Sequence, residues 1–403
     1  MNMILQLSWK NIWRTRKRSF AVIGSIAVGV WALSFLFAFT NAFNEGYIRN
    51  AIQYDYSHLQ IHHSQYRIDA VLNHFIENAG GIIDKLKQMP EVMAYSDRTI
   101  VNGMVATGKN NQGVQIMGIN PEREEKVTLL KDLMKEGAYF EAKRNPILIS
   151  ETLAKKLDAK IRSKVVLTFQ DSTGNITAAA FRVDGIFESK SPKINEGVVY
   201  VRQQDIQSLV QLHEVHEIAV LLHQTEEIPA VKEQLSTGFD AEVMSFRELA
   251  PEFDLISQQS EVSKQILTLI VMLALLFGIV NTMLMAVLER TKELGMLRAI
   301  GLHKGKVFSM VMLETVLMSV LGGPIGVVLG VLTNGYYSSN GMDLSSYSEG
   351  LKEYGYDTIF YPSLESTQYP ILMGVVIVTA FIGAIYPAIK AIRLNPVESI
   401  RKI

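Results

Sequence analysis

The sequence predicts an α-helical membrane protein with four transmembrane helices and a large α/β extracytoplasmic domain inserted between the first and second spans. Two observations support this fold class. Four long apolar blocks stand apart from a long region of mixed polarity, and basic residues cluster beside only some ends of these blocks. Hydrophobic residues make up 48% of the 403 residues, so the apolar character is concentrated in the blocks rather than spread along the chain.

The four apolar blocks supply the predicted spans. They cover residues 20–39, 266–288, 307–332 and 371–389. About 20 residues, each rising 1.5 Å along a helix, cross a hydrocarbon core of about 30 Å. Glu314 is the one charged residue in these blocks. We therefore place a first span with its stalk at 20–42 and a three-span domain at 263–403.

Lysine and arginine positions predict the orientation. Basic residues precede the first block, separate the second from the third and follow the fourth: Lys10, Arg14, Arg16, Lys17, Arg18, Arg290, Lys292, Arg298, Lys304, Lys306, Lys390, Arg393, Arg401 and Lys402. In the loop at 333–370, Lys352 is the only lysine or arginine. The positive-inside rule then puts both termini and the 289–306 loop in the cytoplasm. Residues 43–262 and the 333–370 loop lie outside it.

Residues 1–19 predict a cytoplasmic amphipathic helix. Leu5, Trp9, Ile12 and Trp13 fall on one helical face, with Lys10 and other basic residues around the opposite face. This pattern is typical of a helix lying among lipid headgroups; the alternative is a simple cytoplasmic extension of the first span. The following block is too long for a signal-peptide core, and no small-x-small cleavage site follows it. We therefore expect an uncleaved anchor rather than a signal peptide.

The external region, 43–262, predicts a mixed α/β domain. Stretches rich in β-branched and apolar residues predict strands at 58–62, 99–107, 113–118, 164–169, 178–187, 198–201 and 217–222. Helices are expected at 81–88, 151–157, 203–209 and 228–235. The sequence DSTGN at 171–175 predicts a hairpin turn. The chain has no cysteine, so packing rather than disulfides must hold this domain together.

Apolar residues at helical spacing continue two spans into the external region. They are Phe39, Phe43 and Tyr47 after the first span and Phe246, Leu249, Phe253 and Ile256 before the second. The spacing predicts two stalk helices that leave the bilayer unbroken and transmit movement rigidly. The alternative is that each helix stops at the interface and a hinge follows.

Small residues on the third span predict close helix packing. Gly322, Gly326 and Gly330 recur every four residues, a pattern that lets helix backbones approach closely. Gly323 and Pro324 beside them predict a kink. Such a face is expected where subunits meet, and the alternative is packing within one subunit.

Polar residues inside the spans need partners. Glu314 is expected to pair with a basic residue near the cytoplasmic interface rather than to carry protons or substrate. Asn281 and Thr282 are expected to form interhelical hydrogen bonds.

No catalytic motif occurs in the sequence. The phosphate-binding pattern GxxxxGK[ST] is absent, so the chain is expected to be non-catalytic and to carry no cofactor. His58, His62 and His63 suggest a metal site, but no cysteine or acidic pair completes a ligand set, so we expect surface strand histidines. The net charge of −1 gives no reason to expect nucleic-acid binding.

The segment ERTKELGMLRAIG, residues 289–301, is a charged, helix-prone run between two spans. Little other cytoplasmic chain separates the spans. We therefore predict that this segment is the lever through which a separate ATPase moves the membrane protein.

Three motifs resemble one known family. The coupling segment at 289–301, YPAIKAIRLNPVESIR at 386–401 and SWKNIWRTRKRS at 8–19 resemble signatures of FtsX-like permeases, the membrane subunits of MacB-type ABC transporters. The order of one span, a large external domain and three spans is also that family's layout. In length and span number the chain is most similar to the lipoprotein-releasing (LolC/LolE-type) permeases, although the 333–370 loop is longer than expected for them.

The resemblance implies a mechanism and partners. It implies a bacterial inner-membrane permease paired with a second copy or a paralogue, and LolD/MacB-type ATPase subunits that hold ATP and magnesium in the cytoplasm. The external part would be a MacB-type periplasmic core domain with a sheet-rich insertion at about 97–215, moved by mechanotransmission. The residues implied as ATPase contacts are Glu289, Arg290, Glu293, Gly295, Leu297, Arg298 and Gly301.

The resemblance also implies a cargo. The leading expectation is release of lipoproteins from the inner membrane to a periplasmic carrier or adaptor. One alternative is MacB-like export of a periplasmic peptide, toxin or drug. Another is an FtsX-like signalling subunit that regulates an external cell-wall hydrolase.

Overall fold

The computed structural model describes residues 2–66, 69 and 71–393, and the chain divides into two compact units. The first, which we call the helical unit, comprises Met1–Asn44, Ser257–Leu344 and Ile359–Ile403. The second, the α/β unit, comprises Glu45–Ile256 and Ser345–Thr358. Arg401, Lys402 and the end of the motif at 386–401 lie outside the described residues.

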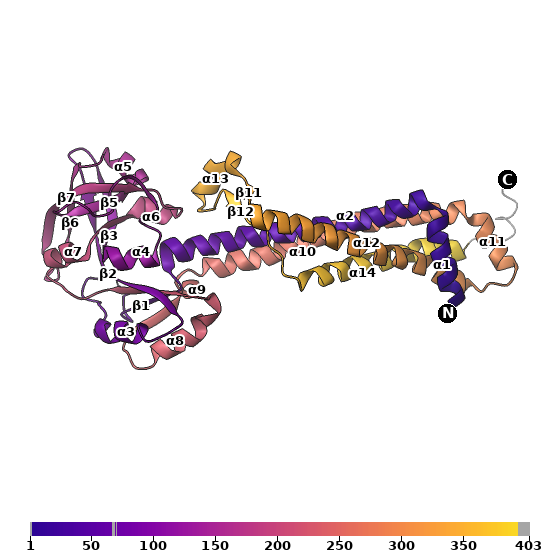
Figure 1. Cartoon of the computed structure of the whole chain (residues 1–403), viewed down its shortest axis with the longest axis horizontal. Helices are drawn as coiled ribbons and strands as arrows, with labels where there is room; N and C mark the ends of the chain where they lie inside the picture. The colour runs from indigo at the N-terminus through magenta and orange to yellow at the C-terminus, as the bar shows by residue number, and fades with distance from the viewer. Residues whose placement is uncertain (1, 67–68, 70, 394–403) are drawn as a thin grey trace. The chain divides into compact units, whose positions relative to one another are not determined.

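The helical unit is built from long apolar helices and two short ones (Figure 1). In chain order they are α1 (Asn2–Arg14), α2 (Arg16–Ala51), α10 (Glu252–Glu289), α11 (Thr291–Ala299), α12 (Lys304–Asn340) and α14 (Gln368–Ile392). Four of them, α2, α10, α12 and α14, are long and apolar enough to cross a membrane. Their common core includes Ile26, Ile279, Val307 and Ala384, all nearly inaccessible to solvent.

Two of these helices continue well beyond their apolar blocks. Helix α2 runs without interruption to Ala51 and is followed by a π-helical turn, Ile52–Tyr56. Helix α10 begins at Glu252, fourteen residues before the predicted span at Ile266. The boundaries between the two units fall inside both helices, at 44/45 and 256/257. The predicted unbroken helix is present in α2. The second one is present only from Glu252, because Phe246 and Leu249 lie in a separate short helix, α9 (Phe246–Leu249), that ends before Ala250.

The α/β unit contains a ten-stranded sheet. Its strands are β1 (Leu59–His62), β2 (Val92–Ala106), β3 (Asn111–Ile119), β4 (Met134–Gly137), β5 (Pro146–Ser150), β6 (Lys164–Gln170), β7 (Ile176–Phe187), β8 (Val198–Arg202), β9 (Glu217–Leu222) and β10 (Glu242–Ser245). The order is β10-β1-β9-β2-β3-β8-β5-β7-β4, and β6 pairs with both β2 and β7.

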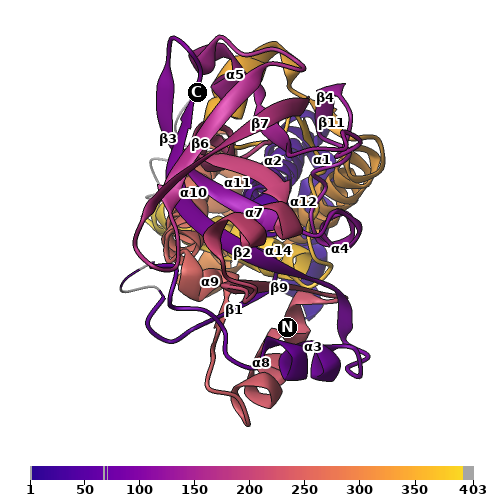
Figure 2. The same cartoon turned by 90° about the vertical axis from the view of Figure 1, so that its left-hand side faces the viewer.

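The double pairing of β6 closes part of the sheet. Strands β2, β3, β8, β5, β7 and β6 form a complete ring of pairs, so this part is a small barrel filled by side chains such as Val105, Leu167 and Phe181. Figure 2 shows β2, β6 and β7 at the front of this unit. The other part, β10-β1-β9 with the first half of β2, packs around Leu59, Val220 and Val231.

Short helices cover the strands. They are α3 (Ala79–Leu86), α4 (Pro121–Val127), α5 (Glu151–Leu157), α6 (Pro192–Gly197), α7 (Gln203–Val210), α8 (Ile228–Ser236) and α9 (Phe246–Leu249), with a 3-10 turn at Thr225–Glu227. The predicted helices near 81–88, 151–157, 203–209 and 228–235 correspond to α3, α5, α7 and α8.

Strand β2 starts seven residues earlier than the sequence predicted, because polar residues in its first half are paired inside the unit. Arg98 is 3% exposed, and its guanidinium donates to Glu124 at 2.6 and 3.0 Å and to Glu217 at 2.5 Å. The sequence also failed to predict β4, β5, β10, α4 and α6, which are only four to seven residues long.

The expectation of surface strand histidines is wrong. His58 and His62 are both buried. The Nδ1 atom of His58 accepts the Leu222 N–H at 3.0 Å, while His62 Nδ1 lies 3.1 Å from the His216 carbonyl oxygen. Their hydrogen-bond partners, Leu222 and His216, lie 164 and 154 residues away in the sequence, which the isolated strand pattern could not show.

The external loop also has structure of its own. Helix α12 extends to Asn340, eight residues beyond the predicted span. The loop then forms a two-stranded pair, β11 (Met342–Asp343) with β12 (Ile359–Phe360), and between them a 3-10 turn, Ser345–Tyr347, and helix α13 (Ser348–Glu353).

Candidate functional site

The candidate site is the turn between α10 and α12, which contains α11. Arg290 occupies the N-cap position of α11 with non-helical dihedrals, so the chain bends between α10 and α11. At the other end Gly301 adopts φ +101°, a conformation that favours glycine, and the Leu302 N–H bonds to the Leu297 carbonyl at 3.0 Å. His303 then caps α12 through the Gly305 N–H. The segment is therefore a short helix with a defined break at each end.

Arg290 fastens α11 to its neighbours. Its side chain is 9% exposed and contacts the Glu314 carboxylate at 3.1 and 3.3 Å. The second guanidinium nitrogen donates to the Asn11 carbonyl and the Thr15 hydroxyl, both at 3.1 Å. One residue thus ties the start of α11 to α12 and to α1. The sequence predicted a basic partner for Glu314, and the structure supplies Arg290.

Further ion pairs connect the same turn to the N-terminal residues. Arg14 pairs with Glu293, and Arg18 pairs with Glu289. Arg298 donates to the Ile392 carbonyl at 3.3 Å, at the end of α14. These contacts link α11 to α1 and α14 and link the end of α10 to α2, so a force applied to this turn acts on all of these helices.

The predicted contact residues differ in exposure. Glu289 and Gly301 are exposed, and Glu293, Leu297 and Arg298 are partly exposed. Arg290 and Gly295 are buried, so direct contact with another protein is not open to them in this conformation.

Two exposed apolar residues were missed by sequence reasoning. Met296 is 49% exposed and Ile300 is 86% exposed, four residues apart on one side of α11. The family motif consists mainly of charged residues and glycines. The i, i+4 spacing of two large apolar residues in a charged segment is the sequence signal that could have identified Met296 and Ile300.

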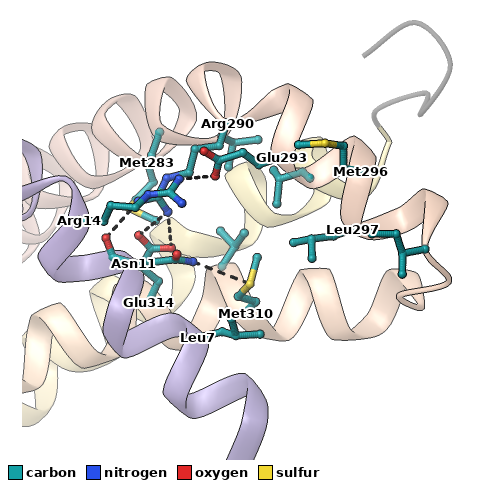
Figure 3. Close-up of a pocket in the computed structure, with 15 residues that line it drawn as sticks. Leu7, Asn11, Arg14, Met283, Arg290, Glu293, Met296, Leu297, Met310 and Glu314 are labelled. Atoms are coloured by element: carbon teal, nitrogen blue, oxygen red, sulfur yellow. Dashed lines mark hydrogen bonds and ion pairs between the residues drawn. The ribbon is translucent and has the colours of Figure 1, made fainter. Parts of the chain in front are cut away.

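A cavity of about 420 Å³ lies against α11 in the helical unit. Its floor is apolar and includes Met283, Val287 and Met310, while Arg290 and Glu314 point toward one another at its polar side (Figure 3). Leu297 lines the same cavity from α11.

Helix α1 has two apolar faces rather than one. Ile12 is buried against the helical core, and the Ser8 hydroxyl donates to the Met310 carbonyl at 3.1 Å. Leu5, Trp9 and Trp13 are exposed, and the two indole rings lie edge to face at 5.9 Å. The grouping of Ile12 with the exposed residues is therefore wrong, since α1 packs on α12.

The small residues of α12 face α2 of the same chain. A Cβ on Gly322 would lie 2.7 Å from the Ile23 carbonyl oxygen, and one on Gly326 would lie 2.5 Å from that of Ala27. Gly330 lies against the side chain of Ser34. The alternative of packing within one subunit accounts for this face, and α12 continues as a helix through Pro324.

The polar residues of α10 do not bond across helices within this chain. Asn281 is exposed, and the Thr282 hydroxyl donates to the Gly278 carbonyl of its own helix. Among the described residues of this one chain, neither side chain forms an interhelical hydrogen bond, so the predicted bonds remain a prediction for a neighbouring subunit. Asn334 instead joins three helices, since its amide donates to the Ser34 carbonyl at 3.4 Å and the Tyr369 hydroxyl at 3.0 Å.

Family comparison explains this combination of parts. The model of the MacB-like periplasmic core domain matches residues 19–237, more than half of the chain. The FtsX-like permease C-terminal model matches residues 266–396, which include α11. The chain belongs to the MacB/FtsX-like permease family.

Individual relatives of this permease include lipoprotein-releasing and macrolide-export proteins. It is 25% identical to the lipoprotein-releasing system transmembrane protein LolC of Xylella fastidiosa (strain 9a5c) over 73% of this chain and 74% of that protein. It is 24% identical to LolC of Neisseria meningitidis over 94% and 92%. The macrolide export ATP-binding/permease protein MacB of Chlorobaculum tepidum is 34% identical over 31% of this chain and 16% of that protein. The permease is thus an ABC transporter permease of the LolC/E and MacB type.

Proposed function

We propose that this permease is the membrane subunit of an ATP-driven machine that releases lipoproteins from the inner membrane and passes them to a periplasmic carrier or adaptor. The observation that carries the proposal is the extent of similarity to LolC. It runs along 94% of this chain and 92% of LolC of Neisseria meningitidis, whereas MacB of Bdellovibrio bacteriovorus matches 78% of this chain but only 48% of its own length. The chain therefore corresponds to nearly the whole of a LolC protein and to about half of a MacB protein.

In this proposal the energy comes from another protein. The chain is non-catalytic and holds no cofactor, and ATP and magnesium are bound by a cytoplasmic LolD/MacB-type ATPase. That subunit docks on α11 through the accessible residues of the turn, namely Glu289, Glu293, Met296, Leu297, Arg298, Ile300 and Gly301. Arg290 and Gly295 contribute from inside by holding the helix in place, since both are buried.

The proposed task requires an energy source. One acyl chain of about 14 carbons, at about 0.8 kcal/mol for each buried methylene, is held in the bilayer by on the order of 10 kcal/mol. Mechanical force delivered at α11 and the residues before it reaches α1, α2 and α12 through the ion pairs described above, and reaches α14 through the hydrogen bond from Arg298 to the Ile392 carbonyl.

The permease is proposed to act as a pair, with a second copy or a paralogue beside it in the membrane. The exposed Asn281 on α10 supports this, because an amide within an apolar span is costly against lipid and is stabilised by a polar partner. Both termini and α11 lie in the cytoplasm, the α/β unit lies in the periplasm, and lipid surrounds the four spans. No nucleic acid takes part.

A second candidate is MacB-like export of a periplasmic peptide, toxin or drug. The local identity of 34% to an export permease favours it. An FtsX-like signalling role for an external cell-wall hydrolase is a third candidate that shares the same C-terminal family model. The three candidates differ in what they act on: a lipoprotein, a periplasmic peptide, toxin or drug, or a cell-wall hydrolase.

Depletion of the permease tests the proposal. We expect lipoproteins normally found in the outer membrane to accumulate in the inner membrane, and expression of the intact chain to restore their sorting. Unchanged lipoprotein sorting together with new drug or peptide sensitivity would support export instead. Unchanged sorting with altered cell-wall cleavage would support the signalling role.

A further inference from the structure

The external loop between α12 and α14 is shared between the two units. Residues Ser345–Thr358 belong to the α/β unit, while Leu344 before them and Ile359 after them belong to the helical unit. The chain therefore passes between the units at 44/45 and 256/257, inside α2 and α10, and again at 344/345 and 358/359, inside this loop. The contacts at α11 described above do not involve this loop.

Within the helical unit the base of the loop packs on α2. Phe360 of β12 is 2% exposed. Its ring stacks on Phe43 with centroids 5.1 Å apart and planes 11° apart, and it lies 6.0 Å from the ring of Phe39. The Asn41 amide donates to the Ser363 carbonyl at 3.4 Å.

Within the α/β unit the tip of the loop packs on the continuation of the same helix. The rings of Tyr356 and Tyr47 have centroids 5.1 Å apart. The amide of Asn50, which is buried, donates to the Gly355 carbonyl at 3.2 Å. Gly355 has φ +77°, and a Cβ there would lie 3.2 Å from the Lys190 carbonyl oxygen, so the loop backbone is fitted closely to this surface.

Asp357 adds charged contacts at the tip. It pairs with Lys190 and lies 4.0 Å from the Arg49 guanidinium. Lys190 lies between β7 of the barrel and α6, so Asp357 connects the loop to this part of the α/β unit as well as to α2. Partly exposed ion pairs contribute little free energy, and the aromatic and amide contacts therefore carry most of the attachment.

The contacts on α2 fall along one stripe. Phe39, Phe43, Tyr47 and Asn50 are spaced by four, four and three residues, which places them on one face of the helix. The sequence showed the aromatic part of this stripe as the outward continuation of an apolar face. The structure shows that the external loop covers it.

We infer that Tyr356, Asp357 and Phe360 are positioning residues that clasp the external loop to α2 and so make the movement of α12 and α14 reach the α/β unit. The inference rests on the proposed mechanical function and identifies part of its path. A helix such as α2 can twist about its own axis when force reaches it at one end, and a loop fixed along one of its faces opposes that twist. The clasp stays closed through the cycle.

The test uses the full permease with its ATPase in proteoliposomes. The chain contains no cysteine, so Ser208→Cys and Ser366→Cys, both at exposed positions of different units, accept spin labels without other changes. The double variant Tyr356→Ala/Phe360→Ala opens the clasp. Tyr347→Ala is the matched control, because Tyr347 is a tyrosine of the same loop that is 71% exposed.

The opened clasp should reduce the nucleotide-dependent change in the spin–spin distance and slow cargo release by about 2- to 25-fold, while the ATPase still co-purifies. The Tyr347 variant should match the wild type. A double variant that folds, as judged by its thermal unfolding, and still shows the full distance change would overturn the inference.

A second variant tests whether the clasp stays closed. Lys190→Cys/Asp357→Cys, joined by a short thiol-reactive cross-linker, locks the loop tip to the α/β unit. Release at the wild-type rate is expected, and arrest by the cross-link would overturn the clasp. If the wild type shows the nucleotide-dependent distance change but releases no lipoprotein, the proposed cargo is rejected. The clasp can still be tested in that case, because the distance change in the double variant does not depend on the cargo. A wild type without any nucleotide-dependent change would overturn both.

Discussion

Arg290 shows how one buried cation can organise a turn between two spans. Its guanidinium contacts Glu314, Asn11 and Thr15, which belong to α12, α1 and the break before α2. Removing one member of such a buried pair leaves the other charge without compensation, which typically costs about 3–5 kcal/mol. The pair therefore fixes the position of α11, whereas the side chains of Met296 and Ile300 remain exposed to solvent.

Two histidines of the α/β unit are held in the neutral form by their hydrogen bonds. His58 Nδ1 accepts the Leu222 N–H, and His216 Nδ1 accepts the Ile100 N–H at 3.2 Å while its Nε2 donates to the Leu72 carbonyl. Burial lowers the pKa of both imidazoles, against smaller opposing effects of Glu227 and Glu226 on His58 and of the hydrogen bond to the Leu72 carbonyl on His216.

The histidine geometry predicts a loss of stability in acid. Below a pH of about 6.5 the unfolded chain takes up protons that the native His58 and His216 exclude, so each site lowers the free energy of unfolding by up to about 1.4 kcal/mol per pH unit until its native pKa is reached. We expect the thermal unfolding temperature of the purified permease to fall between about pH 7.5 and about pH 5.5.

The matched variant for this prediction is His58→Asn. The asparagine oxygen can accept the Leu222 N–H but cannot titrate in this range, so the unfolding temperature of the variant should depend less steeply on pH. An equal or steeper dependence in the variant would contradict the assignment of His58.

At the residue scale, the sequence shows that a buried charge needs a partner more reliably than it shows which residue that partner is. Glu314 inside an apolar span required a cation, but Arg14, Arg18, Arg290 and Arg298 all lay within reach of the interface by sequence position. Burial was less predictable still. The pairing of Arg98 with Glu124 and Glu217 depends on residues 26 and 119 positions away.

At the scale of elements, local chemistry was a reliable guide where a segment is specified by its own ends. Helix α5 starts at the Ser150 N-cap, whose hydroxyl accepts the Leu153 N–H at 3.0 Å, and its predicted bounds are those observed. The DSTGN turn likewise joins β6 to β7, with the Gly174 N–H bonded to the Asp171 carbonyl. Strands such as β5, which are stabilised by neighbours on both sides, carry little local signal.

Helix α11 provides the second prediction. Gly295→Pro removes a backbone donor from the middle of the helix and crowds the preceding turn, at a cost of about 3 kcal/mol or more. The variant should insert into the membrane normally but should fail to stimulate the partner ATPase, because the docking surface loses its shape. ATPase stimulation by purified complexes measures the effect.

Lys304→Pro is the control for the Gly295 variant. Lys304 is the first residue of α12, where a missing N–H is tolerated, and the preceding His303 has extended dihedrals that suit a following proline. Stimulation should therefore remain. Normal stimulation by the Gly295 variant would show that α11 is not the route by which the ATPase acts.

At the scale of the whole molecule, the apolar blocks and basic residues were sufficient to predict four spans and one inserted α/β domain. They could not show that the 333–370 loop returns to α2. This feature depends on contacts between segments about 300 residues apart, such as Asn50 with Gly355. Hydropathy reports whether a segment prefers lipid or water, and it carries no information about which distant segment it contacts.

Orientation is the whole-molecule property on which the proposed mechanism depends. If basic residues determine it, α11 faces the cytoplasm and the α/β unit faces the periplasm. Single cysteines in the cysteine-free chain at the exposed positions Lys292→Cys and Ser208→Cys report on these two sides. A membrane-impermeant maleimide added to spheroplasts should label residue 208 but not residue 292, and detergent should expose both. Labelling of residue 292 in intact spheroplasts would put α11 on the same side as the cargo, where no ATP-driven partner could reach it.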